Sequence, residues 1–144
     1  MTDLELLADA DRRAAAYAAS VADRPPYPSP DALRQLAAFE EGFPDRGMLP
    51  EDTLDLLDRI GGPATAVTTG PRYFGYVVGG VLPAAAAAER MVLAWDQRAS
   101  TFASSPVAAT IEKVAGAWIL DSLDLPRESA VGFGTSATAC TKIG

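Results

Sequence analysis

The sequence contains no histidine and a single cysteine, Cys140. Without histidine the chain lacks the commonest general base, the usual Ser-His and Cys-His nucleophile pairs, and the imidazole ligands of most zinc sites. One cysteine excludes a disulfide within the chain and fits a reducing compartment, so we expect a cytoplasmic protein. Lysine is also scarce, because Lys113 and Lys142 are its two occurrences in 144 residues.

Long hydrophobic runs and excess positive charge are missing as well. No stretch of eighteen apolar residues occurs, and the acidic N-terminus MTDLELLADADRR lacks the layout of a signal peptide. The net charge of -7 leaves no excess of cations to neutralise phosphates, which argues against nucleic acid as a partner. A composition of 49% hydrophobic and 22% charged residues is typical of a globular domain. We therefore expect a small globular protein that binds neither membrane nor nucleic acid.

Helix signals dominate what is present. Thr2 and Glu5 have the spacing of a capping box, which predicts a helix from about Asp3 to Ala22. One stripe of this helix tapers from leucine to alanine and would permit close approach by a partner helix. The stripe consists of Leu4, Leu7, Ala8, Ala14, Ala15 and Ala18.

Proline and glycine punctuate the rest of the chain. The spacing predicts further helices at about 30–42, 50–60, 83–97 and 106–123, with Ser29 as one N-cap and Gly61-Gly62 as one stop. The last helix repeats apolar residues at helical spacing, and Glu112 and Lys113 would turn away from them. These apolar residues are Val107, Ile111, Val114 and Trp118. The fold class is therefore mostly α.

One segment, from Ala130 to Gly134, is the single convincing strand. A lone buried strand leaves backbone donors and acceptors unsatisfied. Either another chain supplies the rest of its sheet, or the remainder of the sheet is missing. The strand leads into Thr135, Ser136, Ala137 and Thr138, where helical N–H groups and hydroxyls could hold a phosphate. The alternative is a capped turn without a ligand, and neither P-loop nor GxGxxG spacing is present.

A second motif is the loop GPRYFGYVVGG, residues 70–80. Aromatic side chains beside glycines suit a loop that lines a pocket, because tyrosine and phenylalanine provide large apolar surfaces with few rotatable bonds. The alternative is a loop whose aromatic residues anchor it in the core.

The order of these pieces resembles the N-terminal third of the pyridoxal-phosphate-dependent group II decarboxylases, which include the aromatic-amino-acid and glutamate decarboxylases. The similarity runs from about Pro50 to Thr138 and covers a loop, two helix starts and a Ser/Thr turn. The matching residues are Gly70-Pro71-Arg72-Tyr73-Phe74-Gly75-Tyr76, Ser104-Ser105-Pro106, Glu112, Trp118 and Ser136-Ala137-Thr138. Several elements matching in order are more specific than any one of them.

The resemblance implies a fold and a set of sites. Residues 1–62 correspond to an N-terminal helical dimerisation arm. Residues 63–144 correspond to the start of a fold type I, aspartate-aminotransferase-like α/β large domain, here incomplete. Ser136, Ala137 and Thr138 match the turn that holds the phosphate of pyridoxal 5′-phosphate. Tyr76 and Val77 match the loop lining the substrate pocket, and Phe102 matches a segment that reaches the partner subunit's active site.

Departures from the family pattern limit the expected chemistry. Gly70 stands where the family usually has histidine, the ring-stacking histidine is missing, and neither Lys113 nor Lys142 lies in a Schiff-base motif. We therefore assign no catalytic residue and no metal ligand, and we expect little or no turnover by this chain alone. Three interpretations remain: a truncated piece of an amino-acid decarboxylase, a regulatory partner that dimerises with a full-length relative, and a helical interaction protein without chemistry.

Overall fold

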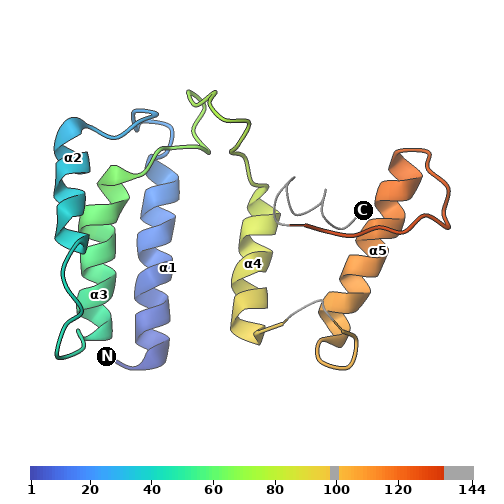
Figure 1. Ribbon diagram of the computed structural model, residues 1–144, viewed down its shortest axis with the longest axis horizontal. Helices are drawn as coiled ribbons and strands as arrows, with labels where there is room; N and C mark the ends of the chain where they lie inside the picture. Colours follow the sequence, from blue (N-terminus) through green and yellow to red (C-terminus); the bar gives the residue numbers. More distant parts are fainter. Residues whose placement is uncertain (98–100, 135–144) are drawn as a thin grey trace. The chain divides into compact units, whose positions relative to one another are not determined.

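The computed structural model describes residues 1–97 and 101–134 (Figure 1). The regular elements in this part of the chain are helices, which confirms the mostly α prediction. The chain divides into two compact units, Met1–Leu82 and Pro83–Gly144, and each is described by itself. Residues 63–82 group with the first unit, and the role of residues 1–62 as a dimerisation arm stays a prediction.

The first helix, α1 (Asp3–Ser20), begins at the predicted capping box. The Glu5 N–H donates to Thr2 Oγ1 at 3.3 Å, and the Thr2 N–H donates to Glu5 Oε2 at 2.8 Å. Hydrogen bonding to the Glu5 carboxylate, first from the Thr2 backbone N–H and then from the Thr2 side chain, holds the pKa of this carboxyl below its ordinary value. The helix ends slightly before the predicted Ala22, and Ser20 O accepts from the N–H groups of Asp23 and Arg24. Pro25 follows directly and disfavours helical geometry at Arg24.

The second helix, α2 (Pro30–Gln35), starts as predicted with Ser29 as N-cap. The Ala32 N–H donates to Ser29 Oγ at 3.2 Å, and Pro30 occupies the first turn, where an N–H is not required. The chain then tightens into the 3₁₀-helix η1 (Leu36–Phe39), so helical structure ends before the predicted Gly42.

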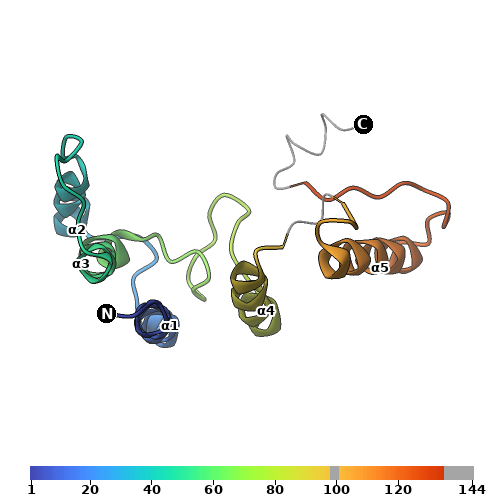
Figure 2. The same ribbon diagram turned by 90° about the horizontal axis from the view of Figure 1, so that it is seen from below.

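The third helix, α3 (Pro50–Leu56), passes into a π-helical turn, η2 (Leu57–Gly61), and a short 3₁₀-helix, η3 (Gly62–Ala64). The predicted stop at Gly61-Gly62 is thus a change of helix type, and Pro63, which lacks an N–H, accompanies the end of helical structure. Figures 1 and 2 show α3 between α1 and α2.

Few side chains of the first unit are buried. Ala32, Ile60 and Val67 are its buried hydrophobic residues, and the Val67 N–H donates to Pro26 O at 3.1 Å. The predicted apolar stripe of α1 lies exposed, with Leu4 78% and Leu7 60% accessible. Hydrophobic burial therefore centres on α2, η2 and the segment at Val67, and α1 adds no buried residue.

The second unit contains α4 (Pro83–Trp95) and α5 (Pro106–Ser122), both close to their predicted ranges. The apolar positions predicted to face the core are exposed on α5: Val107 is 43%, Ile111 59%, Val114 41% and Trp118 69% accessible. The buried residues of α5 are instead Gly116 and Leu120. A Cβ at Gly116 would lie 3.3 Å from Val131 Cβ, so glycine allows the returning segment to cross the helix closely.

The predicted strand at residues 130–134 is not present as a strand. Within the described residues no segment pairs in a ladder, and residues 130–134 follow α5 without a partner strand. The side chain of Val131 lies against the helix at Gly116. The expected beginning of an α/β sheet is therefore not shown, because a strand needs a second strand to satisfy its backbone groups.

Candidate functional site

Tyr76 and Val77, the predicted substrate-pocket residues, lie at the tip of an irregular loop in the first unit. Both have left-handed backbone geometry, with φ of 56° and 52°. Such values are uncommon for non-glycine residues, and for a β-branched residue they indicate strain. Their side chains are 91% and 106% accessible, so a pocket that used them would need its other walls from elsewhere.

The base of this loop is held closely to the rest of the first unit. Gly79 has a φ of 101°, and a Cβ there would lie 1.9 Å from Thr68 O, so the position requires glycine. Arg72 Nη2 donates to the carbonyl oxygens of Ala22 and Arg24, the first at 3.1 Å. A firmly held base thus carries an exposed aromatic tip.

Phe102, the third predicted pocket residue, belongs to the second unit and is 66% accessible. It precedes the start of α5, where Thr101 Oγ1 and Ser104 Oγ share a hydrogen bond of 2.7 Å. Ser105 is 2% accessible there, and its N–H donates to Thr101 O at 3.1 Å. Tyr76 and Val77 are therefore neighbours within one unit, while Phe102 is placed in the other.

The predicted phosphate turn, Ser136-Ala137-Thr138, lies outside the described residues and stays a prediction. Among the residues that are described, the one lysine is Lys113, which is exposed on α5. The described side chains do not form a set that fits pyridoxal phosphate, because no buried lysine or ring-stacking group is assembled there. The case for this cofactor rests on residues 136–138 and the family resemblance.

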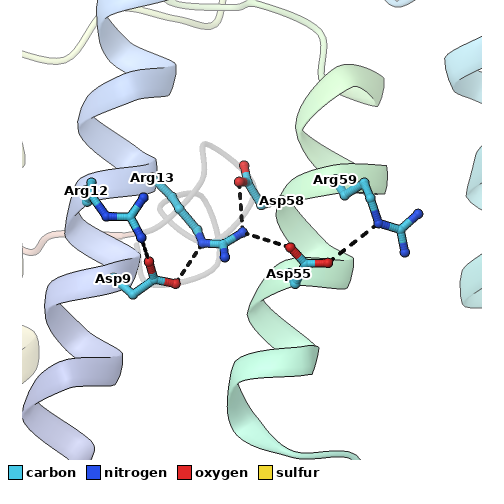
Figure 3. A network of polar contacts seen from close by, with 6 residues as sticks. All are labelled: Asp9, Arg12, Arg13, Asp55, Asp58 and Arg59. Carbon is cyan, nitrogen blue, oxygen red and sulfur yellow. Dashed lines mark hydrogen bonds and ion pairs between the residues drawn. The ribbon is translucent and has the colours of Figure 1, made fainter. Parts of the chain in front are cut away.

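A site that the sequence did not reveal lies between α1 and α3 in the first unit. One end is a network of ion pairs centred on Arg13 (Figure 3). Arg13 Nε lies 2.8 Å from Asp9 Oδ2, and Nη1 lies 3.0 Å from Asp58 Oδ2 and 3.5 Å from Asp55 Oδ1. Arg12 also pairs with Asp9, and Arg59 pairs with Asp55 at 3.6 Å. Three arginines thus balance three aspartates.

The other end of the site is a set of hydrogen bonds around Tyr17 that includes no carboxylate. Tyr17 Oη and Thr65 Oγ1 lie 2.7 Å apart, and Thr65 Oγ1 donates to Gly62 O at 3.0 Å. Arg24 Nη1 donates to the same carbonyl oxygen at 3.0 Å, and the Arg24 guanidinium lies 4.3 Å from the centroid of the Tyr17 ring. A cation over an aromatic face is attractive, so Arg24 helps to fix the ring.

Between these two ends runs an open groove with a volume of about 500 Å³. Its walls are mainly small or aliphatic: Ala10 and Ala14 on α1, and Leu54, Leu57, Gly61 and Gly62 opposite. Arg13, Asp58, Tyr17 and Thr65 complete its lining. Volumes of 300–1,000 Å³ with apolar walls and a few polar groups are typical of small-molecule sites.

The sequence contained a partial signal for this groove. Arg13 and Tyr17 are four residues apart and therefore lie on one side of α1, while Arg24 follows the end of the helix. The apolar stripe overlaps that side at Ala14 alone among its members, so the stripe did not point to the groove. Their partners lie far along the chain, 48 residues from Tyr17 to Thr65 and 38 from Arg24 to Gly62. Such pairings depend on the tertiary fold rather than on local spacing.

Two further features of the described residues bear on function. They contain no group of three or more His, Cys, Asp or Glu side chains placed to hold a metal ion. None of the helices in residues 1–97 and 101–134 has both the length and the apolar character required to span a bilayer.

Comparison with known proteins gave no match to a family model, to a curated protein or to a solved structure.

Proposed function

We propose that this chain contributes the N-terminal dimerisation arm and the phosphate turn of a cytoplasmic, pyridoxal-phosphate-dependent amino-acid decarboxylase of the group II type. Such a lyase removes CO2 from an L-amino acid, and the cofactor supplies the electron sink when bound. The ordered match of residues 70–138 to the family pattern supports the activity. The exposed face of α1 supports the pairing of subunits, and it is the observation on which the structural half of the proposal depends.

The orientation of α1 is unusual for a helix of a monomeric domain. Arg13 and Tyr17 link α1 to α3 and the turn beyond it, while the leucine and alanine stripe stays exposed. Apolar helix faces ordinarily supply the burial that stabilises a fold. The side chains through which α1 docks, Arg13 and Tyr17, are therefore polar. Most of the apolar stripe stays exposed to contact a second chain, and Ala14 at its edge also lines the groove beside α3.

Residue sizes along the stripe favour an antiparallel pair of α1 helices. In an isologous pair the same surface serves both subunits. With the two-fold axis near Asp11, Leu4 lies opposite Ala18 of the second copy, Leu7 opposite Ala15, and Ala8 opposite Ala14. Large side chains then meet small ones on both sides of the axis, while the two Asp11 carboxylates meet near it and oppose the pairing as like charges. A parallel pair would set leucine against leucine and leave the alanine ends apart.

Two substitutions test this pairing by sedimentation equilibrium of the whole chain. Leu7→Ala removes a contact in both copies and should weaken the dimer on the order of tenfold. Adding Ala15→Leu restores a large-to-small contact in the antiparallel register, so the double variant should regain most of the affinity. Ala16→Leu, on α1 outside the stripe, is the matched control. A chain that is monomeric at all concentrations, or a double variant as weak as Leu7→Ala, contradicts the pairing.

The cofactor half is tested by ligands that cannot react with surface lysines. Pyridoxamine 5′-phosphate and pyridoxamine differ by the phosphate alone, so their affinities isolate the proposed turn. We expect the phosphorylated ligand to bind more tightly, and we expect Ser136→Ala with Thr138→Ala to remove the difference. Calorimetry of the whole chain measures both. Equal affinities for the two ligands would contradict a phosphate site at 136–138.

A second candidate function is a helical interaction partner without chemistry, which pairs with a full-length relative or with itself. The exposure of the apolar faces of α1 and α5 favours this candidate, because the described residues leave both faces accessible to another chain. Dimerisation through α1 combined with no preference for the phosphorylated ligand would select this candidate over the first.

A further inference from the structure

The hydrogen bonds at the Tyr17 end of the groove determine which hydrogen-bonding group a ligand must have there. Thr65 has one hydroxyl hydrogen, and it is donated to Gly62 O. The 2.7 Å contact between Tyr17 Oη and Thr65 Oγ1 must then use the tyrosine hydrogen. Tyr17 Oη is consequently a donor within the protein, and its lone pairs accept no hydrogen bond from the described residues. A ligand at this end would have to supply an N–H or O–H donor.

The charges at the opposite end argue for a neutral ligand. Arg13 is shared among Asp9, Asp55 and Asp58, and Arg12 and Arg59 pair with two of these carboxylates. The three cations and three anions balance one another, so the network holds no excess charge for an ion to neutralise. At this end an ionic ligand would lose hydration without gaining an unpaired partner, and Arg24, which lies over the Tyr17 ring, is not in the groove lining.

The middle of the groove accommodates an apolar body. Ala10 and Leu54 face it from α1 and α3, and the π-helical turn contributes Leu57 and Gly61. Single π-helical turns inside helices occur frequently at functional sites. A volume of about 500 Å³ exceeds that of a bicyclic aromatic molecule, so the groove is large enough for one without rearrangement of its walls.

We propose that the groove between α1 and α3 binds a small, neutral aromatic molecule with one hydrogen-bond donor directed at Tyr17 Oη. The aromatic body lies against the alanine and leucine walls, and the donor reaches the hydroxyl that Thr65 leaves available as an acceptor. The proposed site uses none of residues 136–138, and it requires no cofactor.

Indole and benzofuran make a matched pair of probes, because they have nearly the same shape and only indole has an N–H donor. Titration of the isotopically labelled whole chain, followed by amide chemical shifts, should show both probes perturbing residues of α1 and η2. Indole should bind about three- to tenfold more tightly, which corresponds to one neutral hydrogen bond. No saturable shift with either probe, or equal affinities, overturns the proposal.

Two substitutions at the Tyr17 end of the groove distinguish a hydrogen bond between the ligand and Tyr17 Oη from a general loosening of α1. Tyr17→Phe removes the acceptor and should lower indole affinity to that of benzofuran. Thr65→Val breaks the same internal hydrogen bond but keeps the tyrosine hydroxyl, so it should leave the indole preference intact. If Thr65→Val abolishes the preference as fully as Tyr17→Phe does, the hydroxyl is not the ligand's partner and the proposal fails.

A substitution at the apolar wall tests the location. Ala10→Phe fills the groove and should abolish binding of both probes, whereas Ala16→Phe, on α1 but not in the groove lining, should not. Circular dichroism verifies that both variants keep their helices. Binding that survives Ala10→Phe places the probes elsewhere. Shifts in the groove that follow protein concentration rather than probe concentration show that a second copy covers it, which also overturns the proposal.

Discussion

Arg13 on α1 and Asp58 in η2 form an ion pair of 3.0 Å between residues 45 positions apart in the sequence. The Arg13 side chain is 23% accessible and that of Asp58 is 48% accessible, so the pair is only partly shielded from water. Such pairs contribute modestly and are screened by salt. This contact and the Tyr17–Thr65 hydrogen bond nonetheless link α1 to the rest of the first unit.

The first prediction concerns this ion pair. A double-mutant cycle of Arg13→Met and Asp58→Asn, measured by urea unfolding, should give a coupling free energy of about 0.5–1 kcal/mol. The coupling should shrink at high salt. Arg12→Met is the control, because Arg12 is 73% accessible and its ion pair among the described residues is with Asp9 of the same helix. A coupling near zero at low salt would show that the pair does not hold α1.

The second prediction concerns the capping box. The pKa of Glu5 is lowered by its bonds to Thr2, so its stabilising effect is present above the unfolded value of 4.5 and is lost as pH falls through the folded value. Glu5→Ala should reduce helical circular dichroism at pH 7, and the difference from the natural sequence should disappear well below that value. Glu41 lies outside the described helices, so Glu41→Ala should leave the helical circular dichroism unchanged both at pH 7 and in acid. A Glu5→Ala deficit that is unchanged in acid contradicts the prediction.

The third prediction concerns the crossing of α5 by the returning segment. Gly116→Leu places a side chain where Val131 lies, so the segment should detach and trypsin should cleave after Arg127 faster. At present Arg127 Nε pairs with Asp121 Oδ1 at 3.0 Å. Gly132→Leu is the control, since a Cβ there meets nothing within 4 Å. Unchanged cleavage in Gly116→Leu would show that the segment does not depend on this contact.

The fourth prediction compares two glycines of the exposed loop. Gly79 and Gly80 both have positive φ, 101° and 86°, so alanine strains either backbone by about 1–2 kcal/mol. Only at position 79 would the added Cβ also meet the backbone oxygen of Thr68. Gly79→Ala should therefore cost clearly more unfolding free energy in urea than Gly80→Ala. Equal losses would mean that the close approach at Thr68 is absent in solution.

Local features of the fold were readable from the sequence. The capping box at Thr2 and Glu5, the Ser29 cap and the proline starts of α2, α3, α4 and α5 depend on hydrogen bonds and sterics within a few residues. Their positions follow from residue types alone. The predicted strand at 130–134 is not present, because strand formation needs a partner strand and local sequence does not provide one.

The packing faces were harder to predict. Periodicity identified the apolar side of α5, yet the contact forms at Gly116, where a missing side chain rather than a large one permits close approach. On α1 the apolar stripe was also recognised, but the helix docks through Arg13 and Tyr17. The groove between α1 and α3 was missed because Asp58 and Thr65 reach it from distant parts of the chain. A periodic pattern shows which side is apolar and does not show what that side meets.

The scarcity of buried hydrophobic residues in the first unit has a thermodynamic consequence. The heat capacity change of unfolding is set largely by the apolar area newly exposed to water. With Ala32, Ile60 and Val67 as the buried hydrophobic residues described there, that change should be small for a unit of this length. Calorimetry should therefore record a shallow stability curve with weak cold destabilisation, and a broad melting transition.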